Sequence, residues 1–394
     1  MNIPRYVDSS EAAEHWDVYA SMFGGIPTAE IDEMSEFWTA FPALKKALFT
    51  ESGIPYVNVS TPDIKSAIKS HPDVVGFEKA FNAAFSTFPA FLKEELIDRM
   101  GSIEISKAET VLSADIFERL KEIPLIDKYA AFQLLDDDWT GISIDLEMLQ
   151  TEGFAATKKV DPNLVIKKKD GKDQEVQEGW VGHIIPFDLV QATLLSAETD
   201  ELHGLESRLA EIPSEYMSIL DEMTEEDKES CNDVLTEEGD AFVPKEVSKK
   251  IKELKKDRSP ESVALRTLLE KVESLIKSEK EIKAEIKAKS AALQAKTKDT
   301  IESLSDEQAL DLLEKKWIAP LIESIHKLPD TVIDSLVSQI QALQNKYATT
   351  FFEVEQQISE TEATLSGMID DLEGNEYDML GLNELKKLLG GSAE

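Results

Sequence analysis

Residues 123–191 of this 394-residue chain read IPLIDKYAAFQLLDDDWTGISIDLEMLQTEGFAATKKVDPNLVIKKKDGKDQEVQEGWVGHIIPFDLVQ and contain two different periodicities. The first part has apolar residues at helical spacing, interrupted by the acidic run 136–138 and resumed from 139 to 149. Beyond Gly153 the apolar residues favour extended strands on both sides of Asp170-Gly171, a dipeptide that strongly signals a tight hairpin turn. We therefore predict helical segments with a break at 136–138, followed by a β-hairpin within 164–185.

The rest of the chain carries patterns typical of helices, and no other stretch is clearly β. Five prolines between residues 42 and 89 predict several short helices in the N-terminal part. A stripe of aromatic residues at helical spacing is expected to lie in the core, with an aromatic ligand site as the alternative: Phe77, Phe81, Phe85 and Phe88.

The predicted fold class is mainly α, with a helical N-terminal segment, a small central β-hairpin and a C-terminal long-helix or coiled-coil region. The expected segments are a helical segment (1–122), a central α+β element (123–200), an acidic and basic helical linker (201–260) and a coiled-coil-like domain (261–394).

Two long runs of apolar residues mark the C-terminal part. From Leu265 to Leu293 they recur every three or four residues between charged residues, which is a coiled-coil signature. A second run extends from Ile333 to Leu365 and should end near residue 367 or 374. The two helices could pair as an antiparallel hairpin, or each could pack on the body of the protein. Aromatic residues of the second run fall outside a two-helix seam, and we predict that they contact a partner: Tyr347, Phe351 and Phe352.

Charge limits the partners of the chain. With 42 basic and 78 acidic residues, the formal net charge is −36, so the chain repels nucleic acid overall and any DNA contact must be local. Two positive islands, at 157–172 and 245–258, each have a local charge of +4, and the acidic stretch 223–239 is expected to be a surface loop or linker. The lysines of the first island are our candidates for DNA-phosphate contact: Lys158, Lys159, Lys167, Lys168, Lys169 and Lys172.

Sequence motifs for catalysis and cofactor binding are absent. No Gly-x-Gly occurs, so neither a dinucleotide fingerprint nor a P-loop is present, and no serine nucleophile elbow is found. The five histidines have no metal-ligand spacing, and 136–138 is expected to be a helix cap and solvated turn. We therefore predict no catalytic, cofactor-binding or metal-binding residue. Asp170-Gly171-Lys172 matches the acid-x-Lys element of some nucleases, so a metal-dependent nuclease is a remaining alternative.

The expected location is the cytoplasm. A single cysteine, Cys231, excludes an internal disulfide and fits a reducing compartment. The N-terminal residues lack the basic region and apolar core of a signal peptide, and no apolar run is long enough to span a bilayer.

Six strings of residues stand out together: NIPRYVD (2–8), PLIDKY (124–129), QTEGF (150–154), GWVGH (179–183), KWIAPL (316–321) and GL (381–382). They resemble the C-terminal region of the modification subunit of type I restriction-modification systems. As a set they extend over essentially the whole chain.

The resemblance implies a helical extension of a subunit that transfers a methyl group from S-adenosylmethionine to adenine N6. The family's hallmarks, an Asn/Asp-Pro-Pro-Phe/Tyr motif and a Gly-rich cofactor loop, are absent here, so this chain alone is predicted to be non-catalytic and to hold no cofactor. The implied partners are the specificity subunit, the methyltransferase catalytic portion and DNA within the complex. The implied role is subunit assembly and DNA positioning. A free-standing coiled-coil scaffold unrelated to DNA is the alternative from another functional class.

Overall fold

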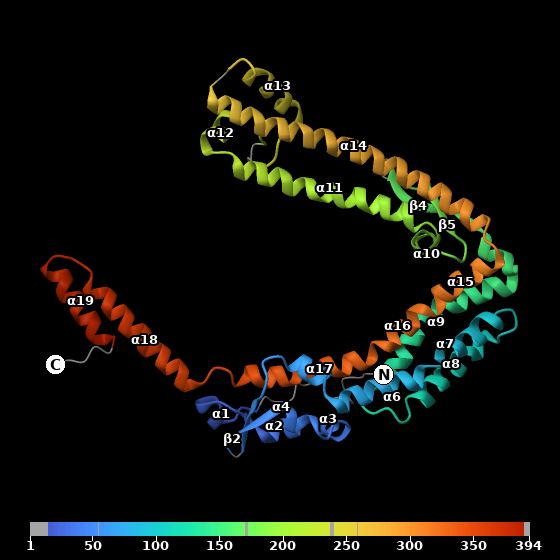
Figure 1. Cartoon of the computed structure of the whole chain (residues 1–394), viewed down its shortest axis with the longest axis horizontal. Coiled ribbons are helices and arrows are strands. Elements are labelled where there is room, and N and C mark those ends of the chain that lie inside the picture. Colours follow the sequence, from blue (N-terminus) through green and yellow to red (C-terminus); the bar gives the residue numbers. More distant parts are fainter. Residues whose placement is uncertain (1–14, 54, 170–171, 237–239, 258, 390–394) are drawn as a thin grey trace. The chain divides into compact units, whose positions relative to one another are not determined.

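The structure is a computed structural model that describes residues 15–389 except 54, 170–171, 237–239 and 258 (Figure 1). Within the strands, the side chains of residues 52, 53, 167, 169 and 172 also lie outside the description. The chain divides into two compact units, of which the first comprises residues 1–91, 109–137 and 321–394 and the second residues 92–108 and 138–320. Every helix within the described ranges is too short or too polar to cross a lipid bilayer.

The described chain is mainly α, as predicted, with a small antiparallel hairpin and long helices towards its C-terminal end. The helices, two of them not α, are α1 (Val18–Phe23), α2 (Thr28–Asp32), α3 (Ser35–Ala40), α4 (Leu44–Leu48), α5 (Ile64–Lys69), α6 (Pro72–Phe85), α7 (Phe88–Leu92), the π-helix η2 (Lys93–Asp98), α8 (Ile105–Arg119), α9 (Lys128–Glu152), the 3-10 helix η3 (Phe154–Lys158), α10 (Phe187–Leu194), α11 (Ser196–Glu222), α12 (Glu225–Ser230), α13 (Pro244–Leu254), α14 (Pro260–Glu302), α15 (Asp306–Trp317), α16 (Ala319–His326), α17 (Leu328–Lys346), α18 (Phe351–Asp370) and α19 (Glu376–Leu388). The strands are β1 (Ile26–Pro27), β2 (Phe49–Gly53), β3 (Tyr56–Val59), β4 (Val160–Lys169) and β5 (Lys172–Gly182).

A three-stranded antiparallel sheet in the first unit was not expected from the sequence. Its strand order is β1–β3–β2, with Ile26 opposite Val57 and Phe49 opposite Val59. No clear β pattern marks these residues in the sequence, so the sequence did not reveal this sheet. Strands of two to five residues are too short to show the alternation of apolar and polar residues that marks a longer strand.

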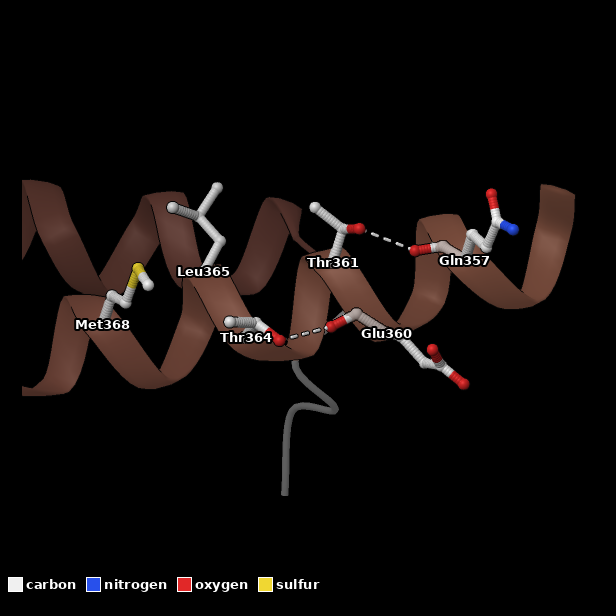
Figure 2. A pocket seen from close by; sticks show the side chains of 6 residues that line it. All are labelled: Gln357, Glu360, Thr361, Thr364, Leu365 and Met368. Carbon is white, nitrogen blue, oxygen red and sulfur yellow. Dashed lines mark hydrogen bonds between the residues drawn. The ribbon is translucent and has the colours of Figure 1, made fainter.

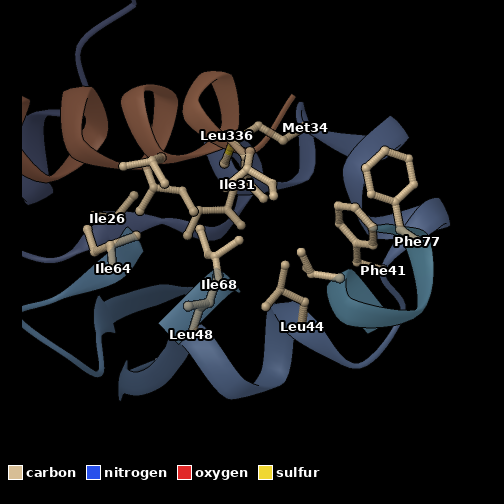
Figure 3. Close-up of a cluster of buried hydrophobic side chains, with 14 residues drawn as sticks. Ile26, Ile31, Met34, Phe41, Leu44, Leu48, Ile64, Ile68, Phe77 and Leu336 are labelled. Atoms are coloured by element: carbon tan, nitrogen blue, oxygen red, sulfur yellow. The ribbon is translucent and has the colours of Figure 1, made fainter. Parts of the chain in front are cut away.

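The core of the first unit joins its N-terminal elements to α17 (Figure 3). Ile31, Leu44 and Ile68 are fully buried there, together with Ile333 and Leu336 from α17. Two exposed ion pairs, Lys65–Asp334 at 2.7 Å and Lys69–Asp330 at 2.6 Å, connect α5 with α17. Exposed pairs contribute little stability, so burial of the apolar side chains holds α17 in place.

The stripe of phenylalanines on α6 and α7 is buried, which confirms its expected place in the core. Phe77, Phe81, Phe85 and Phe88 are all less than 7% exposed. The guanidinium carbon of Arg119 lies 5.2 Å from the centre of the Phe88 ring, and an Arg119 nitrogen donates to the carbonyl of Ala84 at 2.7 Å.

Helix α9 runs without interruption from Lys128 to Glu152, so the predicted break and solvated turn at 136–138 was wrong. Gln133 donates to Asp137 at 2.8 Å one turn along the helix, which places that carboxylate on a helical surface. The apolar spacing continues across the acids, since the buried residues recur at three or four positions throughout: Ala131, Leu135, Trp139, Ile142, Leu146 and Leu149.

The predicted hairpin is confirmed as β4 and β5, which pair antiparallel in the second unit. Val165 lies opposite Val176, and Lys168 lies opposite Asp173. A bulge between Pro162 and Leu164 shifts the register nearer the base of the hairpin. The predicted turn, Asp170-Gly171, lies outside the described residues.

The stripe from Leu265 to Leu293 forms one side of an antiparallel helix pair, but its partner is α11. Ion pairs connect Glu198 with Lys296 and Glu201 with Lys289 at one end, and the hydroxyl of Tyr216 donates to Glu279 at 3.1 Å towards the other. Leu265, Val272, Leu275 and Leu293 are buried on α14, whereas the apolar residues of α17 lie in the core of the first unit. The two runs therefore do not pair with each other: α14 packs within the second unit, and the α17 part of the second run packs within the first.

The second predicted run is two helices. Helix α17 ends at Lys346, and α18 starts at Phe351 after a short break. Hence the prediction of one continuous helix from 333 to 365 was wrong.

The acidic stretch beginning at Met223 is not a surface loop over its described part. Met223, Cys231 and Val234 are buried, and they pack with Val247 of α13 and Leu269 of α14. The short helix α12 starts with a capping box, which satisfies its first backbone N–H groups. The buried side chains between 223 and 236 therefore contribute to the core of the second unit, while most of the acidic residues between them stay exposed.

Candidate protein-interaction surface

Helices α18 and α19 form a helical hairpin with well-defined starts. Before α18, the hydroxyl of Thr350 accepts from the backbone N–H of Glu353 at 3.1 Å, and the Glu353 carboxylate accepts from the N–H of Thr350 at 3.1 Å. A similar capping box with Asn375 starts α19. Lys386 of α19 pairs with Asp370 of α18 at 2.6 Å, which connects the two helices.

One face of α18 carries a coiled-coil stripe that is open to solvent. Seven positions alternate by three and four, and we call them the α18 seam: Phe351, Val354, Ile358, Thr361, Leu365 and Met368 on α18, and Leu372 just beyond its end. The six apolar members are between 37% and 61% exposed. In a coiled coil such positions are buried against a partner helix. The α18 seam therefore has the pattern of a helix interface without the burial.

The surface around the seam is shallowly hollowed (Figure 2). Two adjoining depressions have volumes of about 540 and 440 Å³, and both are lined by Gln357, Thr361 and Leu365. The hydroxyls of Thr361 and Thr364 donate to the carbonyls of Gln357 and Glu360, at 2.7 and 2.8 Å. Because those hydroxyls are satisfied within the helix, Thr361 needs no polar partner and can be covered by an apolar side chain.

The hairpin is acidic from the start of α18 to the first turn of α19. Residues 351–378 include nine aspartates and glutamates and no lysine, arginine or histidine. A second copy of the same acidic surface would be repelled, whereas a helix with basic residues beside its apolar stripe would be attracted.

The structure separates the three predicted interface aromatics. Phe351 and Phe352 are each 61% exposed and border or belong to the α18 seam. Tyr347 is only 4% exposed, and its hydroxyl donates to Glu30 and accepts from the backbone N–H of Asp17 at 3.1 Å. Burial, followed by the hydrogen bond to Glu30, raises the pKa of Tyr347. Tyr347 therefore connects elements within the first unit and is not part of the exposed surface.

The lysines proposed for DNA contact have different surroundings. Lys158 pairs with Asp306 at 2.6 Å, and Lys159 pairs with Glu152. Lys168 is exposed, with Asp173 opposite it in the hairpin register. The side chains of Lys167, Lys169 and Lys172 lie outside the description. Two of the three described candidates thus already have acidic partners.

His183 connects the base of the hairpin to the end of α9. Its Nδ1 lies 2.6 Å from Asp161 on β4, and its Nε2 lies 3.1 Å from Glu152. The hydrogen bond with Asp161, and the weaker one with Glu152, hold the pKa of His183 above its ordinary value. Lys159 and then His183 hold the pKa of Glu152 below its usual range. Sequence spacing did not reveal this cluster, because its three main residues are far apart along the chain.

A buried polar cluster explains two of the strings that carry the family resemblance. The indole N–H of Trp317 donates to Asp145 at 2.7 Å, and Lys316 donates both to Asp145 and, at 2.6 Å, to the carbonyl of Ile184. Gly182 is required by the same local geometry, because an added Cβ would lie 1.7 Å from the carbonyl oxygen of Ile185. These residues fix the base of the hairpin to α9 and α15. Packing and hydrogen bonding therefore account for the residue types at Gly182 in GWVGH and at Lys316 and Trp317 in KWIAPL.

No group of three or more His, Cys, Asp and Glu side chains within the described ranges could hold a metal ion. Asp170 and Gly171 of the acid-x-Lys element lie outside those ranges. Comparisons of the chain with protein-family models, curated proteins and solved structures find no match.

Proposed function

We propose that this chain is a non-catalytic, helical part of the modification subunit of a type I restriction-modification complex. In that role it would hold other subunits together and position DNA while the complex methylates adenine N6. The observation that carries the proposal is the exposed α18 seam, because apolar heptad positions in water favour association with another helix. The resemblance in the six strings gives the family.

The partner proposed for the α18 seam is a long helix of the specificity subunit. The acidic flanks of α18 lead us to expect a stripe of apolar residues on that helix with lysine or arginine beside it. The absence of a Gly-rich loop and of a Pro-Pro motif supports a non-catalytic role, since S-adenosylmethionine and a flipped adenine both require such surfaces in the family.

Co-expression with a specificity subunit and a methyltransferase catalytic portion tests the proposal. We expect Ile358→Glu combined with Leu365→Glu to abolish co-purification, because each apolar side chain loses burial energy of roughly 1.5–3 kcal/mol, or about tenfold to a hundredfold in affinity. The matched control is Ala363→Glu, which adds charge to an exposed position of α18 outside the α18 seam. Normal assembly of the double variant would show that the docking surface lies elsewhere.

Two further measurements separate the alternatives. If the chain is a scaffold unrelated to DNA, even the unaltered protein will not capture the specificity and methyltransferase subunits. Saturable one-to-one binding of S-adenosylmethionine in a calorimetric titration would contradict the non-catalytic assignment. Cleavage of DNA in the presence of a divalent metal would favour the nuclease.

A further inference from the structure

A small cavity in the second unit has the composition of a binding site for an organic cation. It lies between α11, α14 and the segment that precedes α13, and its volume is about 250 Å³. Pockets for drug-sized ligands occupy roughly 300–1,000 Å³, so this one is the size of a single large side chain. Its walls include Pro213, Tyr216, Phe242 and Pro244.

Two aromatic rings flank the cavity in fixed positions. The centres of the Tyr216 and Phe242 rings are 6.1 Å apart, and their planes are inclined by 54°. Tyr216 is fixed by its hydrogen bond to Glu279 on the neighbouring helix. The backbone beside Phe242 is fixed by hydrogen bonds from Thr236 to Ala241 at 2.9 Å and from Val243 to Val234 at 2.7 Å. The faces of such rings attract cations.

The charged residues that line the cavity are both acidic, Asp240 and Glu279. Lys283 pairs with one oxygen of Glu279, and Tyr216 donates to the other, so these contacts hold the pKa of Glu279 below its usual range. Glu279 is therefore ionised near neutral pH. A carboxylate accepts about four hydrogen bonds, so acceptor positions remain on both Glu279 and Asp240.

We propose that this cavity binds an arginine side chain presented by a partner polypeptide. A planar guanidinium can stack on the aromatic rings while its N–H groups donate to the carboxylates, which a lysine ammonium does less well. The net charge of −36 attracts basic segments towards the site. This site is separate from the α18 seam, so each can be tested without the other.

The experiment follows tyrosine ring resonances by NMR while the full chain is titrated with a short Gly/Ser peptide that contains one arginine. Tyr216→Phe assigns the relevant resonance. We expect a saturable shift at Tyr216 with the arginine peptide and none with the same peptide carrying citrulline, which has nearly the same shape without the charge. The double variant Asp240→Asn with Glu279→Gln should bind at least about tenfold more weakly, since two charge-assisted hydrogen bonds are lost.

The matched control is Glu281→Gln, which removes one charge from an exposed residue of the same helix outside the cavity and should bind like the parent. Far-UV circular dichroism checks that each variant is folded. Equal shifts with arginine and citrulline, no shift with either, or unchanged affinity of the double variant would overturn the proposal. Tighter binding of a lysine peptide would overturn the assignment to a guanidinium.

Discussion

The buried cluster of Asp145, Lys316 and Trp317 allows a prediction of stability. Asp145 is only 6% exposed, and its carboxylate accepts from both the Trp317 indole and the Lys316 ammonium. Asp145→Ala would remove both acceptor contacts and leave a buried N–H and a partly buried charge without their partner. Breaking a buried ion pair typically costs about 3–5 kcal/mol, and hydrogen bonds to charged groups contribute about 1.5–3 kcal/mol each.

The expected loss lies at the lower end of that range. The Lys316 side chain is 27% exposed, so water can partly replace the lost carboxylate, and Lys316 retains its bond to the carbonyl of Ile184. We therefore expect Asp145→Ala to lower the free energy of unfolding by about 3 kcal/mol. Asp145→Asn keeps an oxygen that can accept from Trp317 but loses the charge, so it should cost less.

Urea denaturation followed by circular dichroism measures these differences, and hydrogen exchange of 139–149 and 309–317 localises them. The control is Asp311→Ala, which breaks an exposed ion pair with Lys315 on the same helix and should cost below about 1 kcal/mol. If Asp145→Ala stays within about 1 kcal/mol of the parent, or costs no more than the control, the cluster does not stabilise the base of the hairpin.

Other predictions follow from single contacts. The pKa of His183 is raised in the folded protein, so its acidic partners stabilise the protein fully below about pH 6.5, and this contribution is lost as the pH rises through the folded value. The difference in unfolding free energy between the parent and His183→Gln should therefore shrink from pH 6 to pH 9. A constant difference would show that the charged form of His183 does not stabilise the base of the hairpin. Tyr347→Phe should destabilise by about 1–2 kcal/mol in urea denaturation, since it removes the hydroxyl bonds within the first unit, whereas Phe352→Ser at the surface should change stability by less than about 0.5 kcal/mol; the opposite order would be inconsistent with the burial. In an assembled complex, Lys168→Gln should reduce the salt dependence of DNA binding by about one ion equivalent. Lys158→Gln should reduce it by less, because Lys158 is already paired with Asp306. If Lys168→Gln leaves the slope of log affinity against log salt concentration unchanged, this lysine does not contact phosphate.

Local periodicity predicted the elements whose pattern extends over many turns. The stripe from Leu265 to Leu293 and the phenylalanines of α6 were recognised because their buried faces repeat at helical spacing. The partner of the stripe was not predictable, because an apolar face does not specify which other apolar face covers it. In α9 the three adjacent acids at 136–138 suggest a break, although the buried residues keep helical spacing from Ala131 to Leu149 and the helix is continuous.

The candidate site was only partly visible in the sequence. The apolar spacing of Val354, Ile358 and Leu365 within the second run is visible in the sequence, but their exposure depends on which neighbours fold against them. Tyr347 and Phe351 are four positions apart, and their spacing predicts the same role for both. Tertiary contacts then bury the first against Glu30 and leave the second in water. The cavity at Tyr216 and Phe242 depends on residues from three elements that no local pattern connects.

The capping box at Thr350 also affects how the length of α18 can change. Because Thr350 and Glu353 satisfy the first N–H groups locally, the start of α18 does not depend on continuing the hydrogen-bond ladder of α17. Insertion or deletion of seven residues within α18 would lengthen or shorten the α18 seam by about 10 Å and keep it on one face, whereas a single inserted residue would turn everything beyond it by about 100°. Homologous chains should therefore differ in this region by multiples of seven residues. The length of α18 could then change during evolution without repacking the core around Leu336.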